Sequence, residues 1–408
     1  AAEKGARLRN FEELRRQLLD RLDTGRELEE AEIREAIDNL VLEEGRTCLL
    51  SLKEKTELRN ALFYSVRGLD VLQELAEDPQ VTEIMANGCR NIFFEKGGVI
   101  RRWDRGFSSP ERLEDVIQQI AGRCNRTVNE QMPVMDARLA DGSRVNVVMR
   151  PVALDGPVLT IRKFPDRPMT MDRLVSLGTL TREAADFLRE LVEAGYTILV
   201  GGGTSTGKTT FLNALSAFIP ADERIVTIED NAELQLQGIE NLVRLEARPE
   251  SLQGGREISI RDLIRTALRM RPNRIIIGEV RGAEAGDFLN CLNTGHEGSL
   301  GSAHANSIQD MAGRLEMMAL MGTRLPAEVI RRQIAAGIQV LIHLERDREG
   351  RRKVEEIGEI TGVQEGEVQV ASLYRRASTG ELERTGELQK RRKLERYRKW
   401  CRRSDRRD

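Results

Sequence analysis

The sequence has no run of about 18 uncharged apolar residues, and its first residues, AAEKGARLRN, lack the apolar stretch of a signal peptide. Its five cysteines are scattered and form no CxxC pair, which argues against a disulfide framework or a zinc knuckle. Aromatic residues make up 4% of the chain, too few for a base-stacking surface as its main function. We therefore expect a cytoplasmic protein with reduced thiols.

Neither sign of charge dominates, because 64 Lys and Arg residues nearly balance 66 Asp and Glu residues for a formal net charge of -2. With 40% hydrophobic and 32% charged residues, the composition is that of a globular protein rather than a disordered chain. At about 150 residues per domain, a chain of 408 residues is expected to form two or three domains.

The first part of the chain divides into a helical segment and a mixed segment. Residues 1–70 carry apolar side chains at helical spacing among dense charge and predict a small helical extension. Residues 71–165 predict an α+β domain, because strand-like runs such as VTEIMANG and RVNVVMR flank one helix, residues 110–122, capped by Ser109. Pro165 and Pro168 disfavour helix, so residues 166–170 are expected to be a linker.

The second part of the chain alternates helical segments with apolar runs such as TILVGGG, RIVTIED and RIIIGEV. This alternation predicts an α/β domain over residues 171–346, with a parallel sheet buried on both faces. Residues 347–408 contain two strand-like runs around Gly366, which predict a β-hairpin, and end in a basic tail.

A phosphate-binding loop is the strongest local motif. Residues 202–209 fit G-x-x-x-x-G-K-[ST], directly after an apolar strand and before a helix. Backbone N–H groups and the helix N-terminus would hold phosphates, Lys208 would reach the β- and γ-phosphates, and Thr209 would bind Mg²⁺. The alternative is a glycine-rich turn with an exposed lysine. The residues expected to bind nucleotide are Gly202, Gly203, Thr204, Ser205, Thr206, Gly207, Lys208, Thr209 and Thr210.

Acidic residues follow two other predicted strands. Glu279 ends the run RIIIGE, where a carboxylate can orient a water molecule for hydrolysis. Glu229 and Asp230 end the run RIVTIED, and Glu233 lies three residues beyond. We expect Glu279 and Glu229 to take part in catalysis, and Thr209, Glu229, Asp230 and Glu279 to contact Mg²⁺, the acids in part through water. Either Asp230 or Glu279 could instead cap a helix.

Two of the three histidines, His296 and His304, lie in the segment NTGHEGSLGSAHAN. Their concentration suggests a catalytic role, although a lone histidine is commonly structural. A metal site of His and Cys ligands is not expected, since no third ligand completes a set at suitable spacing.

The segments GGTSTGKTT, RIVTIEDNAELQL, LRMRPNRIIIGEVRG and NTGHEGSLGSAHANS, in this order, resemble the ATPases of type II and type IV secretion systems. They look most like the CpaF-like ATPases of Tad/Flp (type IVc) pilus assembly, and the resemblance covers residues 69–344. It implies an α/β, RecA-like P-loop ATPase domain after a PAS-like α+β domain. It also implies a homohexamer that hydrolyses ATP with Mg and drives domain motion against inner-membrane platform proteins, from the cytoplasmic face of that membrane.

The resemblance also assigns residues to roles. Lys208 and Thr209 match the Walker A pair, Glu279 the Walker B glutamate, and His296 and His304 the histidine box. Glu229, Asp230 and Glu233 match the aspartate box. Arg144 and Arg162 occupy positions from which related ATPases reach the nucleotide, although an ordinary surface ion pair is the alternative. Weaker candidates for contacts between subunits are Arg244, Arg248, Arg269, Arg271 and Arg281. The absence of a CxxC pair disfavours the zinc-containing extension ATPases.

The sequence leaves open the role of the basic tail and the substrate that the motor would move. Residues 390–408 hold eleven basic and three acidic residues, a charge that suits anionic lipid but equally a solvated helix or a frayed end. Binding of nucleic acid is not expected, because no base-reading element accompanies this charge. The alternatives to a pilus or protein-secretion motor are the motor of a conjugative DNA-transfer (type IV secretion) system, a nucleic-acid translocase and a non-catalytic nucleotide switch.

Overall fold

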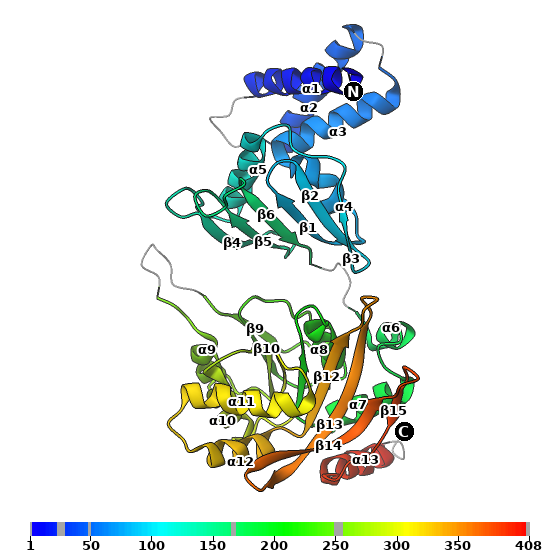
Figure 1. Ribbon diagram of the computed structural model, residues 1–408, viewed down its shortest axis with the longest axis vertical. Helices are drawn as coiled ribbons and strands as arrows, with labels where there is room; N and C mark the ends of the chain where they lie inside the picture. Colours follow the sequence, from blue (N-terminus) through cyan, green and yellow to red (C-terminus); the bar gives the residue numbers. More distant parts are fainter. Residues whose placement is uncertain (1, 23–28, 48–49, 165–168, 249–255, 405–408) are drawn as a thin grey trace. The chain divides into compact units, whose positions relative to one another are not determined.

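The computed structural model describes residues 2–22, 29–47, 50–164, 169–248 and 256–404. The chain forms two compact units, Ala1–Asp166 and Arg167–Asp408 (Figure 1). Most of the predicted linker, residues 166–170, lies outside the described residues. Within the described ranges, no helix combines the length and the apolar character needed to cross a bilayer.

Three helices open the first unit: α1 (Ala2–Arg21), α2 (Glu30–Thr47) and α3 (Leu52–Arg67). They bury the apolar residues whose helical spacing the sequence displays, including Leu18, Ile37 and Leu40, in a small core of their own. At the start of α3, the Ser51 hydroxyl accepts from the Glu54 N–H while the Glu54 carboxylate accepts from the Ser51 N–H, a reciprocal capping box.

An antiparallel sheet of six strands follows, in the order β3-β2-β1-β6-β5-β4. Successive side chains of a strand point to opposite faces, so alternate residues of these strands share one face of the sheet. On one face, Ile84, Val145 and Ile161 are buried in one core with the apolar side of α5. The strands are β1 (Val81–Asn87), β2 (Asn91–Lys96), β3 (Val99–Arg102), β4 (Val134–Arg138), β5 (Arg144–Val148) and β6 (Val158–Arg162); the helical elements are η1 (Asp70–Leu72), α4 (Gln73–Glu77) and α5 (Pro110–Arg123).

The second unit is built on a sheet of nine strands in the order β15-β14-β13-β12-β7-β11-β10-β8-β9. The six strands from β12 to β9 are parallel, which confirms the α/β prediction, and the other three are antiparallel. The strands are β7 (Ile198–Gly202), β8 (Ile225–Glu229), β9 (Leu242–Glu246), β10 (Arg274–Val280), β11 (Leu300–Ala303), β12 (Val340–Arg346), β13 (Arg352–Gln364), β14 (Glu367–Arg376) and β15 (Leu382–Arg384).

The hairpin around Gly366 continues this sheet rather than forming a separate part. Strand β13 pairs with β12 from Val340↔Glu359 to Arg346↔Arg352. The predicted boundary between residues 346 and 347 therefore falls inside one sheet. The sequence pattern finds the two strands of the hairpin, but it does not show that their buried faces complete the core of the second unit.

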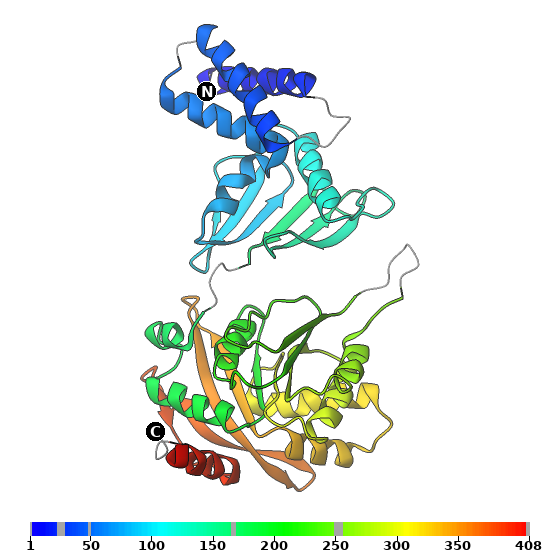
Figure 2. The same ribbon diagram turned by 180° about the vertical axis from the view of Figure 1, so that it is seen from behind.

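Helices cover both faces of the large sheet (Figure 2). In β7, Ile198 and Val200 pack in one core with α6, α7 and α8, whereas Leu199 packs in the other with α9 to α12. The strand before the P-loop is therefore buried on both sides. The helices are α6 (Met171–Ser176), α7 (Arg182–Glu193), α8 (Lys208–Ser216), α9 (Ile260–Ala267), α10 (Glu284–Leu292), α11 (Ile308–Gly322), α12 (Ala327–Gly337) and α13 (Arg392–Ser404).

A buried arginine anchors the start of β10. The side chain of Arg274 is 3% exposed and donates two hydrogen bonds of 2.6 Å to the Glu223 carboxylate. It also donates to the Val192 carbonyl at 2.6 Å. Two parallel N–H···O bonds from a buried guanidinium fix the geometry of both side chains.

We predict that Arg274→Met lowers the free energy of unfolding by about 3 kcal/mol, because it leaves the Glu223 carboxylate without its paired guanidinium. Arg332→Met is the matched control, since the side chain of Arg332 is 73% exposed and pairs with Glu328 one turn away. We expect the control to change stability by less than about 1 kcal/mol. Urea unfolding followed by circular dichroism measures both. Equal effects would contradict a structural role for the buried pair.

Candidate nucleotide-binding site

The P-loop connects the end of β7 at Gly202 to the first residue of α8, Lys208. Gly207 caps this helix with a φ of 92°, a left-handed conformation that glycine adopts without strain. The first backbone N–H groups of α8 point out of its N-terminus toward the loop. The positive end of the helix dipole lies there and favours an anion. All nine residues predicted to bind nucleotide lie in this strand end, loop and first helical turn.

Lys208 lies at the centre of the site. Its side chain is 9% exposed, and Nζ donates to the carbonyl oxygens of Gly202 and Gly203 at 3.2 and 3.0 Å. The same nitrogen lies 3.6 Å from Glu279 Oε1 and 3.4 Å from His304 Nδ1. The loop therefore holds the ammonium group next to the Glu279 carboxylate at the end of β10 and the His304 imidazole just after β11.

Glu279 is held from two sides. Its Oε1 lies 2.8 Å from His304 Nε2, and its Oε2 accepts from Arg281 Nε at 2.7 Å. Burial lowers the pKa of His304; the Glu279 carboxylate opposes this effect, and the cations Lys208 and Arg281 add to it. The structure thus brings together three of the predicted catalytic residues: Lys208, Glu279 and His304.

Glu229 is the most buried acid predicted for the site. It is 3% exposed, and its Oε1 accepts from the backbone N–H groups of Glu233 and Leu234 at 2.8 and 2.9 Å. Burial raises the pKa of its carboxyl group to about 7, despite these two donors. A Cβ at Gly278 would lie 2.8 Å from Glu229 Cγ, so the strand that carries Glu279 must have glycine next to this side chain.

Asp230 and Glu233 are placed differently from Glu229. Asp230 is exposed and lies 3.5 Å from Arg281, which also pairs with Glu279. Glu233 contributes its backbone N–H to the Glu229 carboxylate. The aspartate-box residues therefore divide into one buried carboxyl group and one exposed acid that is linked to Glu279 through a shared arginine.

His296 does not lie with the other catalytic candidates. It precedes β11, which pairs in parallel with β7 from Leu300↔Ile198 onward, so it lies at the edge where β7 begins. The P-loop and His304 lie at the opposite edge, where these strands end. His296 Nδ1 is 3.3 Å from the Cys291 carbonyl oxygen. A catalytic role for His296 within this unit is therefore not supported.

The five arginines considered for subunit contacts are also spread over the unit. Arg281 lies in the site, whereas Arg269 and Arg271 are exposed before β10, at the edge away from the P-loop. Arg244 donates to the Leu234 carbonyl at 3.1 Å, and Arg248 to the Arg256 carbonyl at 3.2 Å.

Two site contacts could not be predicted from the sequence motifs. Arg352, the first residue of β13, donates from Nε to the Ser205 carbonyl of the P-loop at 3.1 Å. Ser302 in β11 donates to the Gly278 carbonyl at 2.6 Å and so links the strands of His304 and Glu279. The nearest sequence signal for Arg352 is its place in the strand-like run after Glu345, which does not show that this strand lies beside β12 and the P-loop.

Arg144 and Arg162 belong to a row of charged residues across the first sheet. The strand register places Arg138 opposite Arg144, Arg144 opposite Arg162, and Arg162 opposite Glu83. Three arginines side by side repel one another, and directly opposed like charges destabilise a sheet. A guanidinium group can bind phosphate through two parallel hydrogen bonds, so an anion is a chemically suitable ligand for such a row.

The residues at the P-loop fit a Mg²⁺ ion bound mainly to nucleotide phosphates. No group of three or more His, Cys, Asp or Glu side chains forms a metal cage among the described residues. Thr209 lies at the start of α8, and Glu229 Oε2 is a buried oxygen with no hydrogen-bond partner. Mg²⁺ keeps several waters and takes one or two protein oxygens together with phosphates, which this set can supply.

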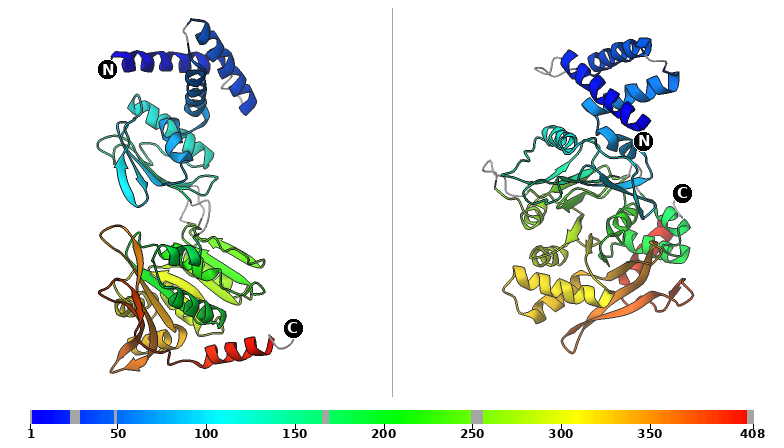
Figure 3. Two further views of the ribbon diagram at one scale, coloured as in Figure 1. Left: turned by 90° about the vertical axis from the view of Figure 1, so that its right-hand side faces the viewer. Right: turned by 45° about the horizontal axis from the view of Figure 1, so that its top comes forward.

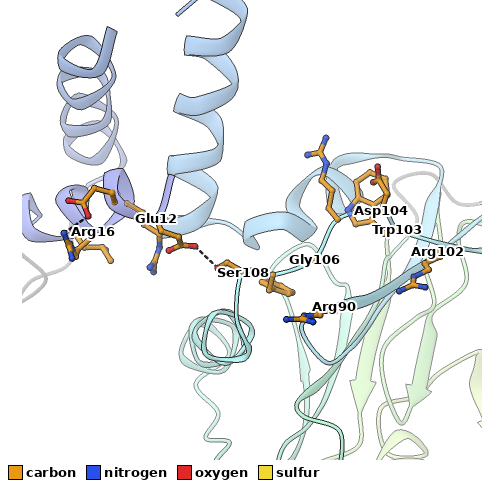
Figure 4. Close-up of a pocket in the computed structure, with 13 residues that line it drawn as sticks. Glu12, Arg16, Arg90, Arg102, Trp103, Asp104, Gly106 and Ser108 are labelled. Carbon is orange, nitrogen blue, oxygen red and sulfur yellow. Dashed lines mark hydrogen bonds and ion pairs between the residues drawn. The ribbon is translucent and has the colours of Figure 1, made fainter. Parts of the chain in front are cut away.

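The first unit also contains a cavity of about 1130 Å³ between α1 and the loop after β3 (Figure 4). There the Ser108 hydroxyl donates to the Glu12 carboxylate at 2.6 Å, and Trp103 and Arg102 line the other side. None of the residues predicted for nucleotide binding lines this cavity.

A glycine-rich loop between a buried parallel strand and a helix that begins with lysine, beside a carboxylate at the end of a neighbouring strand, defines a P-loop nucleotide-binding protein. Residues 66–394 match the family described as Type II/IV secretion system protein. The chain belongs to this family and is an ATPase.

Comparison with individual proteins agrees with this assignment. The chain is 36% identical over 315 residues to a Mycobacterium tuberculosis protein named for conjugal transfer, covering 75% of this chain and 88% of that protein. It is 33% identical over 306 residues to the type IV secretion system protein VirB11 of Brucella suis, covering 68% and 84%. The solved structure of the Yersinia pseudotuberculosis ATPase DotB shares the fold, with a TM-score of 0.53 at 18% identity, covering 73% of this chain and 79% of that chain.

We predict that Glu229 makes the stability of the nucleotide-free protein depend on pH. Its pKa of about 7 in the folded state lies above the ordinary value of 4.5, so the folded protein keeps a proton that the unfolded chain loses between these values. The free energy of unfolding therefore falls as the pH rises through this window, by about 3 kcal/mol in total.

The variant Glu229→Gln lacks this titration. Between pH 5 and pH 7.5, which covers most of this window, the wild type should lose about 2 kcal/mol more stability than the variant in urea unfolding. Comparing each protein with itself at two pH values removes any effect of the substitution on packing. Parallel pH profiles for the two proteins would show that Glu229 has no raised pKa.

Proposed function

We propose that this protein is the ATP-hydrolysing motor of a type IV secretion machine of the conjugal-transfer kind. The observation that carries the proposal is the cluster of Lys208, Glu279 and His304 at the P-loop. It combines a cation for the terminal phosphates with a carboxylate able to hold the attacking water. The names of the two relatives favour conjugal transfer and type IV secretion over the other systems.

The side chains of the cluster have separate tasks in this proposal. When ATP binds, Lys208 exchanges the Gly202 and Gly203 carbonyls for phosphate oxygens, because a charged acceptor forms the stronger bond. Glu279 then accepts a hydrogen bond from the attacking water and orients it toward the γ-phosphorus. Thr209 would help to hold a Mg²⁺ ion, which would supply charge neutralisation to the phosphates. His304 links the Glu279 carboxylate to the ammonium group and so responds to the state of the γ-phosphate.

The Tad/Flp pilus motor is the second candidate, because the motifs of the P-loop, the acidic strands and the histidine segment resemble the CpaF-like ATPases. Deleting the gene in its host and restoring it as wild type or as Glu279→Gln separates the two. Loss of DNA transfer with intact pili supports the conjugal assignment, whereas loss of surface pili with normal DNA transfer supports the pilus motor.

We further propose a homohexamer that works on membrane platform proteins from the cytoplasmic side. Its basis is the family assignment together with exposed arginines such as Arg248 and Arg269, which are available for contacts between subunits. Negative-stain images with and without nucleotide test the ring directly, and a monomer under all conditions would refute it.

The arginine row of the first sheet provides a second source of positive charge. We propose that Arg144 and Arg162 bind the phosphates of ATP, with Arg138 beside them. Three adjacent guanidinium groups gain most from an anion whose negative charge increases as a phosphoryl group leaves.

We predict that Glu279→Gln binds ATP but releases phosphate at least about 100-fold more slowly, because the amide is a poor acceptor for the proton of water. Phosphate release and the binding of a fluorescent ATP analogue measure the two properties. The control Glu328→Gln removes an exposed acid of α12 and should leave both unchanged. Retained turnover in Glu279→Gln would refute the assignment of the base.

We predict that Arg144→Gln combined with Arg162→Gln slows phosphate release by about 10- to 100-fold, since charge stabilisation by each donor is lost. The control Arg126→Gln removes an exposed arginine of the same unit that lies outside the row. Thermal unfolding checks that the sheet is intact. Wild-type turnover in the double variant, with an unchanged KM for ATP, would restrict these arginines to a surface role.

A further inference from the structure

The basic tail is an ordered helix with two different sides. Helix α13 places Arg392, Arg396, Lys399 and Arg403 at spacings of four, three and four residues, which puts all four on one side. We call these four residues the basic face. The opposite side carries Leu394, Tyr397 and Cys401.

The apolar side of α13 is fixed to its unit. Leu394 is 6% exposed and lies in the core that includes α7. Tyr397 donates to the Glu193 carboxylate at 2.7 Å, and Arg398 donates to Glu190 at 2.5 Å, both on α7. Lys393 donates to the Gly195 carbonyl at 2.9 Å. The alternative of a frayed tail is therefore wrong for the described part of the segment.

The docking leaves the basic face exposed. Lys393 and Arg398 are paired with Glu297 and Glu190, but no residue of the basic face forms an ion pair with another described residue. Trp400 is 64% exposed and, at i+4 from Arg396 and i-3 from Arg403, is a surface neighbour of both. Figure 3 (left) shows α13 in red at the margin of its unit.

We propose that the basic face and Trp400 bind the headgroups of an anionic lipid bilayer. The four cations form a straight row about 16 Å long on a rigid helix, so all of them can meet a flat surface at once. Each basic residue near such a surface strengthens binding about fivefold at low salt. An exposed tryptophan next to the row suits the headgroup layer, where an amphipathic ring is most stable.

A nucleic acid would also attract this charge, but it fits the surface less well. The basic face has one exposed aromatic ring and no element that could enter a groove or stack successive bases. An anionic lipid surface would be a partner of the motor proposed above, so the role of this contact rests on that proposed function. Because binding to vesicles requires no turnover, its test is independent of that function.

The test uses the full-length protein with vesicles of phosphatidylcholine alone or mixed with phosphatidylglycerol. The face variant combines Arg392→Gln, Arg396→Gln, Lys399→Gln and Arg403→Gln. The matched control removes the same charge from exposed positions elsewhere, with Lys53→Gln, Arg101→Gln, Arg126→Gln and Arg324→Gln. In vesicle flotation, we expect wild type and control to bind anionic vesicles and the face variant to bind at least tenfold more weakly.

Trp400 provides a second readout, because the chain has two tryptophans. In a Trp103→Phe background, all tryptophan fluorescence comes from Trp400. We expect its emission to shift to shorter wavelength with anionic vesicles at low salt and to return on addition of 0.5 M NaCl, because salt screens surface charge. Thermal unfolding verifies that α13 remains docked in each variant.

Three results would overturn the proposal. The face variant could bind anionic vesicles as strongly as the control, neutral vesicles could bind equally well, or the emission of Trp400 could stay unchanged. Tight binding of DNA that the face variant loses, without binding to vesicles, would assign the surface to nucleic acid instead. Loss of ATP hydrolysis with intact vesicle binding would count against the motor and leave the lipid surface standing.

Discussion

The nucleotide site depends on the parallel pairing of β7, β8, β10 and β11, because parallel strands place their carboxyl ends at one edge of a sheet. This pairing brings Lys208, Glu229, Glu279 and His304 within a few residues of the ends of their strands, although about 100 residues separate the first from the last. A shift of one residue in any pairing would turn a site residue to the other face of the sheet. The two buried faces of the sheet, which hold the register, therefore also hold the geometry of the site.

The sequence predicts the parts of the site whose chemistry is local. The spacing of Gly202, Gly207 and Lys208 specifies a loop that the backbone must form, and the apolar runs before Glu229 and Glu279 specify buried strands. Contacts between distant segments are not encoded in this way. His304 and His296 lie in the same short segment, yet β11 separates them by its full length, and only the strand register reveals which of the two meets Lys208. The extension of the sheet by β13 to β15 is hidden for the same reason.

Burial gives adjacent acids different properties. Glu229 ends β8 in the interior and holds its proton near neutral pH, whereas Asp230 lies exposed beside Arg281. In the sequence they form an ordinary Glu-Asp pair. Glu229 packs against Gly278, the residue that precedes Glu279 in β10, so this titrating group lies beside the strand that carries the proposed base.

Tyr196, two residues before β7, connects the start of that strand to the C-terminal helix α13. Its hydroxyl donates to the Lys390 carbonyl at 2.6 Å and accepts from the Leu394 N–H at 3.3 Å, at the start of α13. The P-loop lies at the other end of the same short strand. Because β7 spans Ile198–Gly202, the anchor of the C-terminal helix and the phosphate-binding loop lie one five-residue strand apart.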